Sequence, residues 1–149
     1  MKVLRWRRFL RREDGNVLIE TAIMITILLV LAFGILDFGR AMFTENNLVS
    51  AAREAARAGA ANSQITGPPT LSDSTKTVAI NRFSTYGTTA LTTSNIAVVC
   101  SNGCTAPSGG SIKVTITYTY NWITPVWRLL HWGSSSSTFH ASAEYRYEL

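Results

Sequence analysis

The feature that most constrains this chain is an apolar run of about 20 residues, 17–36, near its N-terminus. The hydrocarbon core of a bilayer is about 30 Å thick and requires about 20 mostly apolar residues in a spanning helix. Glu20 is the one ionisable residue in the run. A carboxylate near the membrane centre is unfavourable by about 2.5 kcal/mol or more, so a functional role is the default hypothesis for such a group. The run predicts a membrane-spanning helix that carries an unexplained carboxylate.

Basic side chains cluster in front of this run. Residues 1–15 hold six Lys and Arg against two acidic residues, which is +4 of the net charge of +5. Because Lys and Arg beside a spanning helix stay on the cytoplasmic side, we expect the N-terminus inside and the residues after 36 outside. The rest of the chain is nearly neutral, which argues against nucleic-acid binding.

A cleaved secretory signal is an alternative interpretation of the same run. Such signals have an apolar segment of about 7–15 residues followed by a small-residue cleavage site. Here the run is longer and ends in Leu36-Asp37-Phe38-Gly39-Arg40, without an alanine pair at the expected spacing. The pattern therefore favours a helix that is retained.

Two interpretations of Glu20 stay open. In the first, Glu20 lies one turn into the helix, close enough to the headgroups to be tolerated beside the positive end of the helix dipole. In the second, the chain is cut after Gly15, and Asn16 becomes its new N-terminus. Glu20 is then the fifth residue, and its carboxylate pairs with the new α-amine of a neighbouring subunit.

The order of these features resembles a known family. Basic residues, Gly15 and then Glu20 within an apolar helix resemble the prepilin-peptidase recognition site of type IV pilins and pseudopilins. The continuation resembles the TadE-like pseudopilin family of tight-adherence pilus systems, through Asp37-Phe38-Gly39-Arg40, the alanine-rich residues 51–60 and Thr124-Pro125. Asn16 departs from the pattern, because many pilins carry an aromatic residue there.

The resemblance implies a membrane-anchored pseudopilin, or minor pilin, of a tight-adherence type IV pilus. A prepilin peptidase then cuts between Gly15 and Asn16, and Glu20 is the assembly residue. The implied partners are the peptidase, other pilin or pseudopilin subunits, the inner-membrane pilus assembly platform and membrane lipid, with no small-molecule substrate. The implied location is the bacterial inner membrane, crossed once, with a periplasmic or extracellular head. The main alternative is an unprocessed single-pass membrane protein whose exported head binds an envelope or surface ligand.

The helical pattern continues beyond residue 36 without a helix breaker, up to Ala61. Six alanines within residues 51–60 favour a helix and allow close approach by another one. Helical spacing predicts that one face of this helix is packed, and that Asp37 lies outside it. The predicted packed face comprises Phe38, Met42, Val49, Ala52, Ala56 and Gly59. Gly67-Pro68-Pro69 lies among Ser and Thr residues, a composition typical of linkers, and is expected to separate this helix from the next element. The predicted domains are a cytoplasmic, cleaved leader 1–15, a transmembrane and stalk helix 16–61, and an exported head 62–149.

The head combines one more helix with strands. A helix is expected from Ser72 or Asp73 to about Tyr86. Alternation with a period of two predicts strands over residues 112–122 and 139–149, and residues 96–100 are a shorter third candidate. The predicted fold class is α+β and pilin-like. In it, the long N-terminal helix packs on a small antiparallel sheet of about three strands, with one extra short helix.

The remaining motifs point to structure rather than to catalysis. Cys100 and Cys104 flank a turn and predict a disulfide in an exported domain; a metal site is the weaker alternative, since no histidine is near in sequence. Neither histidine, His131 or His140, belongs to a catalytic motif, so no enzyme, cofactor or metal is expected. The tryptophan-rich residues 122–132 are interpreted as core filling, with membrane or subunit contact as the alternative.

Overall fold

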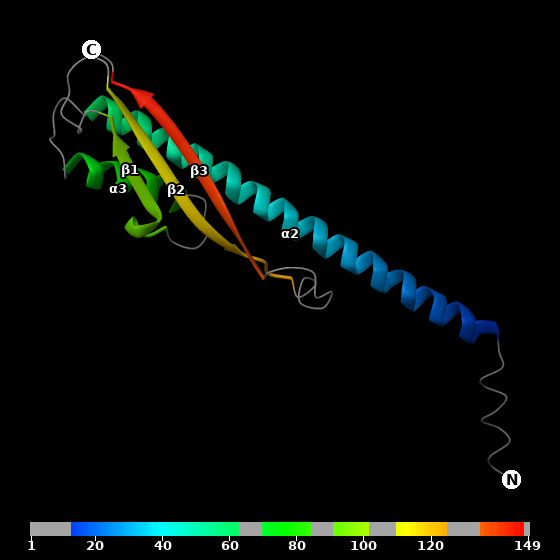
Figure 1. The fold of residues 1–149 in the computed structure, drawn as a ribbon. Helices are drawn as coiled ribbons and strands as arrows, with labels where there is room; N and C mark the ends of the chain where they lie inside the picture. Colours follow the sequence, from blue (N-terminus) through cyan, green and yellow to red (C-terminus); the bar gives the residue numbers. More distant parts are fainter. Residues whose placement is uncertain (1–12, 63–69, 85–90, 102–109, 125–134, 148–149) are drawn as a thin grey trace, which may run out of the picture.

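The computed structural model describes residues 13–62, 70–84, 91–101, 110–124 and 135–147. They form helix α2 (Glu13–Asn62), helix α3 (Thr70–Ser84), a short 3-10 helix η1 (Thr93–Asn95) and strands β1 (Ile96–Cys100), β2 (Ser111–Asn121) and β3 (Ser136–Arg146). The sheet and α3 lie beside the C-terminal half of α2, and the N-terminal half projects beyond them (Figure 1). This arrangement confirms the predicted α+β fold.

Helix α2 is continuous because its sequence offers no break. Residues 13–62 contain no proline. The hydroxyls of Thr21 and Thr26 donate to the carbonyls four residues earlier, at 2.7 and 2.8 Å, so they need no partner from outside the helix. Its 50 residues are about 75 Å long at 1.5 Å per residue, which exceeds the thickness of a bilayer.

The two halves of α2 have different surroundings. Side chains 17–36 are largely exposed, whereas from Asp37 onward one face packs against the head. The predicted composition of that face is wrong in its first two turns, because Phe38 and Met42 are exposed and Asp37 is buried. The cause is a tertiary contact: the hydrogen-bond donors at the end of β2 lie beside Asp37 and bind its carboxylate. The buried residues of this face are Asp37, Ala41, Thr44, Asn47, Leu48, Ala51, Ala52, Ala55, Ala56, Gly59 and Ala60.

Strand β2 is the centre of the sheet. The strand order is β1-β2-β3, and both pairs are antiparallel, with Val98 opposite Val114 and Thr115 opposite Ser142. The predicted alternation of β2 is confirmed, since Ile112, Val114, Ile116, Tyr118 and Tyr120 are all buried. Strand β3 follows its predicted alternation less closely. Ala141 is buried, but Tyr145 is 39% exposed.

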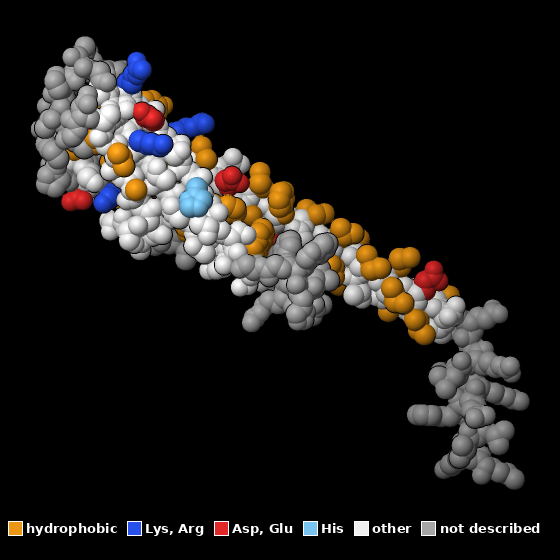
Figure 2. All heavy atoms as spheres, viewed as in Figure 1, with side chains coloured by type: hydrophobic (Ala, Val, Ile, Leu, Met, Phe, Trp, Pro, Cys, Tyr) orange, Lys and Arg blue, Asp and Glu red, His pale blue; other side chains and the backbone are white. Residues whose placement is uncertain are grey.

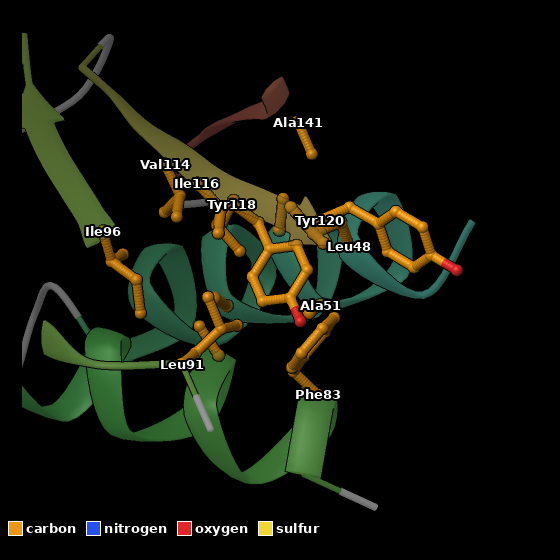
Figure 3. Close-up of a cluster of buried hydrophobic side chains, with 14 of the residues drawn as sticks. Leu48, Ala51, Phe83, Leu91, Ile96, Val114, Ile116, Tyr118, Tyr120 and Ala141 are labelled. Atoms are coloured by element: carbon orange, nitrogen blue, oxygen red, sulfur yellow. The ribbon is translucent and has the colours of Figure 1, made fainter. Parts of the chain in front are cut away.

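The core lies between the inner face of the sheet and the two helices. Phe83 on α3 is fully buried and its ring meets Tyr118 of β2, with centroids 5.3 Å apart. Leu48 and Ala51 of α2 complete this cluster (Figure 3). Helix α3 begins at Thr70, two or three residues before the predicted start, and ends at Ser84; the predicted end at Tyr86 lies outside the described residues. Both helices therefore contribute to the apolar core of the head.

Helix α2 packs closely against the rest of the head at Gly59. A Cβ at this position would lie 2.6 Å from Ile112 Cδ1 and 2.8 Å from Thr75 Oγ1. We expect Gly59→Leu to lower the free energy of unfolding by about 1–3 kcal/mol through overpacking. The measurement is the urea midpoint of the full chain in detergent. Gly39→Leu is the matched control, because a Cβ at Gly39 meets nothing within 4 Å. Equal midpoints for the two variants would contradict the close packing at Gly59.

Candidate functional site

The exposed half of α2 is the first part of the candidate site. Helix α2 is long and apolar enough to cross a membrane, and none of its most apolar stretch is buried inside the protein. Figure 2 shows apolar side chains along the narrow part of the molecule that extends beyond the head. A soluble protein rarely exposes so large an apolar surface. The exposed segment therefore suggests a membrane anchor.

The three residues predicted to mediate processing and assembly lie together at the start of α2. Helix α2 begins at Glu13, so the bond between Gly15 and Asn16 lies in its first turn. A Cβ added to Gly15 meets nothing within 4 Å, and Asn16 and Glu20 are exposed. Glu20 stands four residues after Asn16, about 6 Å along the helix axis. These positions fit the predicted roles, which remain predictions.

A second part of the site, which the sequence reasoning missed, is a buried carboxylate at the junction of α2 and the head. Asp37 is 2% exposed. Its Oδ1 accepts hydrogen bonds from the Tyr120 hydroxyl at 3.2 Å and the Ile123 backbone N–H at 3.4 Å. Its Oδ2 accepts from the Thr124 backbone N–H at 3.2 Å and the Thr124 hydroxyl at 2.8 Å. We call Asp37, Tyr120, Ile123 and Thr124 the Asp37 junction.

The local sequence explains why the junction forms here. Strand β2 ends at Asn121, so the N–H groups of Ile123 and Thr124 have left the strand ladder and need other acceptors. Asp37 lies at the start of the packed face of α2, and its two carboxylate oxygens accept the hydrogen bonds from these N–H groups. A sequence signal was available, since Asp37 and Thr124 both belong to the motifs that carried the family resemblance.

The electrostatics of the junction favour an ionised Asp37. Burial raises the pKa of its carboxyl, but the hydrogen bonds from Thr124, Ile123 and Tyr120 lower it by more, so the pKa lies below its ordinary value. Burial and the neighbouring carboxylate raise the pKa of the Tyr120 hydroxyl, which therefore stays protonated and donates. Asp37 follows directly after the apolar segment 17–36, so this charge lies just outside the proposed membrane span.

The other predicted site residues are separate from this junction. Cys100 ends β1, and its predicted disulfide partner Cys104 lies outside the described residues, so that bond remains a prediction. His140 is exposed on β3 with its Nδ1 3.2 Å from the Thr117 hydroxyl, and His131 lies outside the described residues. Among the described residues no group of three or more His, Cys, Asp or Glu side chains could hold a metal ion.

The tryptophan-rich segment is described only at its start. The ring of Trp122 meets Tyr120 edge-on, with centroids 5.3 Å apart, and its Nε1 donates to the Ser137 hydroxyl at 3.1 Å. These contacts fit the core-filling interpretation for Trp122. Trp127 and Trp132 lie outside the described residues.

A pocket of about 260 Å³ lies at the opposite end of the head from the Asp37 junction. It opens between the last turns of α2 and the end of β3, and two arginines are among its lining residues: Arg57, Ala60, Ala61, Tyr145 and Arg146. His140 does not line it. Among the described residues, the lining of this pocket therefore places no histidine beside a nucleophilic side chain.

One family model matches part of the chain. Residues 15–57 match the family model described as TadE-like protein, which confirms the family resemblance over these residues. The match covers the exposed segment of α2, Glu20, Asp37 and most of the packed alanine face. No curated protein and no solved structure matches the chain.

Proposed function

We propose, starting from the match of residues 15–57 to the TadE-like family, that this protein is a membrane-anchored pseudopilin of a tight-adherence type IV pilus. A prepilin peptidase cuts it between Gly15 and Asn16, and α2 then assembles with the helices of other pilin or pseudopilin subunits on the inner-membrane assembly platform. The observation that carries this proposal is the exposed apolar segment 17–36 of α2, which lies within the family-matched region and contains a single carboxylate, Glu20.

The proposed orientation follows from charge. Residues 1–12 hold all six basic side chains of the leader, so the N-terminus stays in the cytoplasm and the head is exported to the periplasm or the outside. Glu20 then lies near the cytoplasmic side of the span. After cleavage its carboxylate pairs with the α-amine of a neighbouring subunit, which neutralises two charges in a medium where neither is stable alone.

One observation favours a second candidate function. Helix α2 runs through the Gly15–Asn16 bond, so that bond is helical in the uncut chain. An unprocessed single-pass protein, whose exported head binds an envelope or surface ligand, requires no cut there. Because the first turn of a helix lacks intrahelical partners for its N–H groups, the bond can still unwind locally and reach a peptidase.

Cleavage is tested by the N-terminal sequence and intact mass of the protein purified from membranes that contain the prepilin peptidase. We expect the chain to begin at Asn16 and to lack residues 1–15. We also expect Gly15→Leu to block the cut, whereas Gly39→Leu is cut normally; both glycines face open space in the subunit, so neither change disturbs its packing. A wild-type chain that begins at Met1 in the presence of the peptidase would support the single-pass receptor instead.

Assembly is tested by replacing Glu20. We expect Glu20→Ala to insert in the membrane normally but to reduce piliation by at least about tenfold, because losing one partner of a buried charge pair removes about 2–5 kcal/mol. Glu45→Ala is the matched control, since Glu45 is an exposed glutamate on the same helix outside the apolar segment. Normal piliation by Glu20→Ala, measured by pilus yield, would contradict the assembly role.

A further inference from the structure

The exposed apolar surface of α2 does not stop where the apolar run ends. Phe38 is 60% exposed, and Leu36, two residues before it, is exposed to a similar degree. Ile123, from the segment after β2, is also 60% exposed. Helix and head thus both present apolar side chains near the start of the packed face.

The Asp37 junction fixes the height of Ile123 along α2. The Ile123 N–H donates to the carboxylate of Asp37, the residue that directly follows Leu36. One residue corresponds to about 1.5 Å of helix rise. The headgroup layers together add about 10–15 Å to the hydrocarbon core, so each is about 5–7 Å thick. Phe38, about 3 Å beyond Leu36, and the backbone of Ile123 therefore fall within one headgroup layer.

The charges at this height are arranged as a lipid interface requires. The carboxylate of Asp37 is buried against donors of the head, so its negative charge does not face the headgroups. Arg40 is exposed about 6 Å beyond Leu36, the height of lipid phosphates. Because Arg40 is exposed and the carboxylate of Asp37 is buried, this surface favours contact with anionic lipid groups.

We propose that the head rests on the membrane surface, with Ile123 and Phe38 inserted into the headgroup layer on the head side and Arg40 facing lipid phosphate. This inference rests on the proposed membrane insertion of α2. It adds that the Asp37 junction sets the depth of the head, so that Asp37 marks the boundary at which the helix leaves lipid and enters protein. A lipid surface is the occupant because this apolar patch is continuous with the segment that spans the membrane.

The test measures the depth of position 123 in the full chain, reconstituted in vesicles of phosphatidylethanolamine and phosphatidylglycerol. A spin label is attached to Ile123→Cys, and its accessibility to oxygen, which partitions into lipid, is compared with that to a water-soluble nickel complex. Two exposed reference positions receive the same label: Met24→Cys within the apolar segment, and Thr119→Cys on β2, four residues before Ile123, which is at most about 13 Å of extended chain. The unsubstituted chain shows whether either native cysteine takes up label.

We expect the ratio of oxygen to nickel accessibility at position 123 to be shifted from the value at 119 toward the value at 24. A ratio at 123 equal to that at 119, with position 24 in lipid, would overturn the proposal and leave membrane insertion intact. Protection of position 123 from both reagents would also overturn it, because a second protein chain would then cover the patch. A water-exposed position 24 would instead show that the proposed membrane insertion is wrong.

Discussion

Replacing Asp37 with alanine is expected to lower the free energy of unfolding of the full chain by about 3 kcal/mol. Hydrogen bonds to charged groups contribute about 1.5–3 kcal/mol each, but bonds that share one acceptor are not additive. The change also leaves the Tyr120 hydroxyl and the N–H groups of Ile123 and Thr124 without their acceptor. The N–H groups of Ile123 and Thr124 are only partly buried, so hydrogen bonds to water compensate for part of the lost free energy.

The measurement for Asp37→Ala is urea unfolding in detergent, followed by the fluorescence of the four tryptophans, of which Trp122 adjoins the junction. Glu45→Ala is the control for loss of a carboxylate from the same helix, and it should unfold like the wild type. Asp37→Asn should fall between, since the amide keeps one acceptor oxygen but turns an NH₂ group toward another donor. An unchanged midpoint for Asp37→Ala would show that the junction does not stabilise the head.

Acid supplies a second measurement of the same carboxylate. Because the pKa of Asp37 is lower in the folded chain than its ordinary value, its contribution is fully present above the unfolded pKa of about 3.9. That contribution is lost as the pH falls through the folded pKa. Wild type should therefore lose more stability than Asp37→Asn when the pH is lowered below about 4. Parallel pH profiles would contradict an ionised Asp37 at the junction.

Replacing Phe83 with alanine is expected to have an effect at least as large, about 3–5 kcal/mol. Phe83 is fully buried between the helices and the sheet, and its ring packs on Tyr118. Truncation removes the contact with the Tyr118 ring and leaves a cavity among the side chains that surround Phe83 (Figure 3).

The measurement for Phe83→Ala is thermal unfolding of the full chain in detergent. Phe83→Leu is the matched control, since it keeps most of the volume and should lose less than about 1.5 kcal/mol. Wild-type unfolding of the alanine variant would mean that α3 is not part of the cooperative core. If both variants lost the same amount, the ring contact with Tyr118 rather than the cavity would be the cause.

Elements with a regular pattern could be predicted from the sequence. Strand β2 alternates apolar and polar residues, and the structure buries its apolar set. Helix α2 was predictable because a long apolar run passes into an alanine-rich segment without a proline. These signals are local, so residue spacing alone carries them.

The Asp37 junction could not be predicted in the same way. Periodicity assigns apolar Phe38 to the core and charged Asp37 to solvent, and the structure reverses both. The reversal depends on donors more than 80 residues away in sequence, at Tyr120, Ile123 and Thr124. Likewise, Tyr145 is 39% exposed although the alternation of β3 assigns it to the buried face.

The alanine face of α2 has a consequence for how the protein reaches its native state. Ala51, Ala52, Ala55 and Ala56 form one wall of the core that also contains Val114 and Ile116. A fragment that starts after residue 62 lacks that wall and exposes the apolar side of its sheet to water. The packed half of α2 and the head are therefore one folding unit, and the head needs this part of α2 to complete its core.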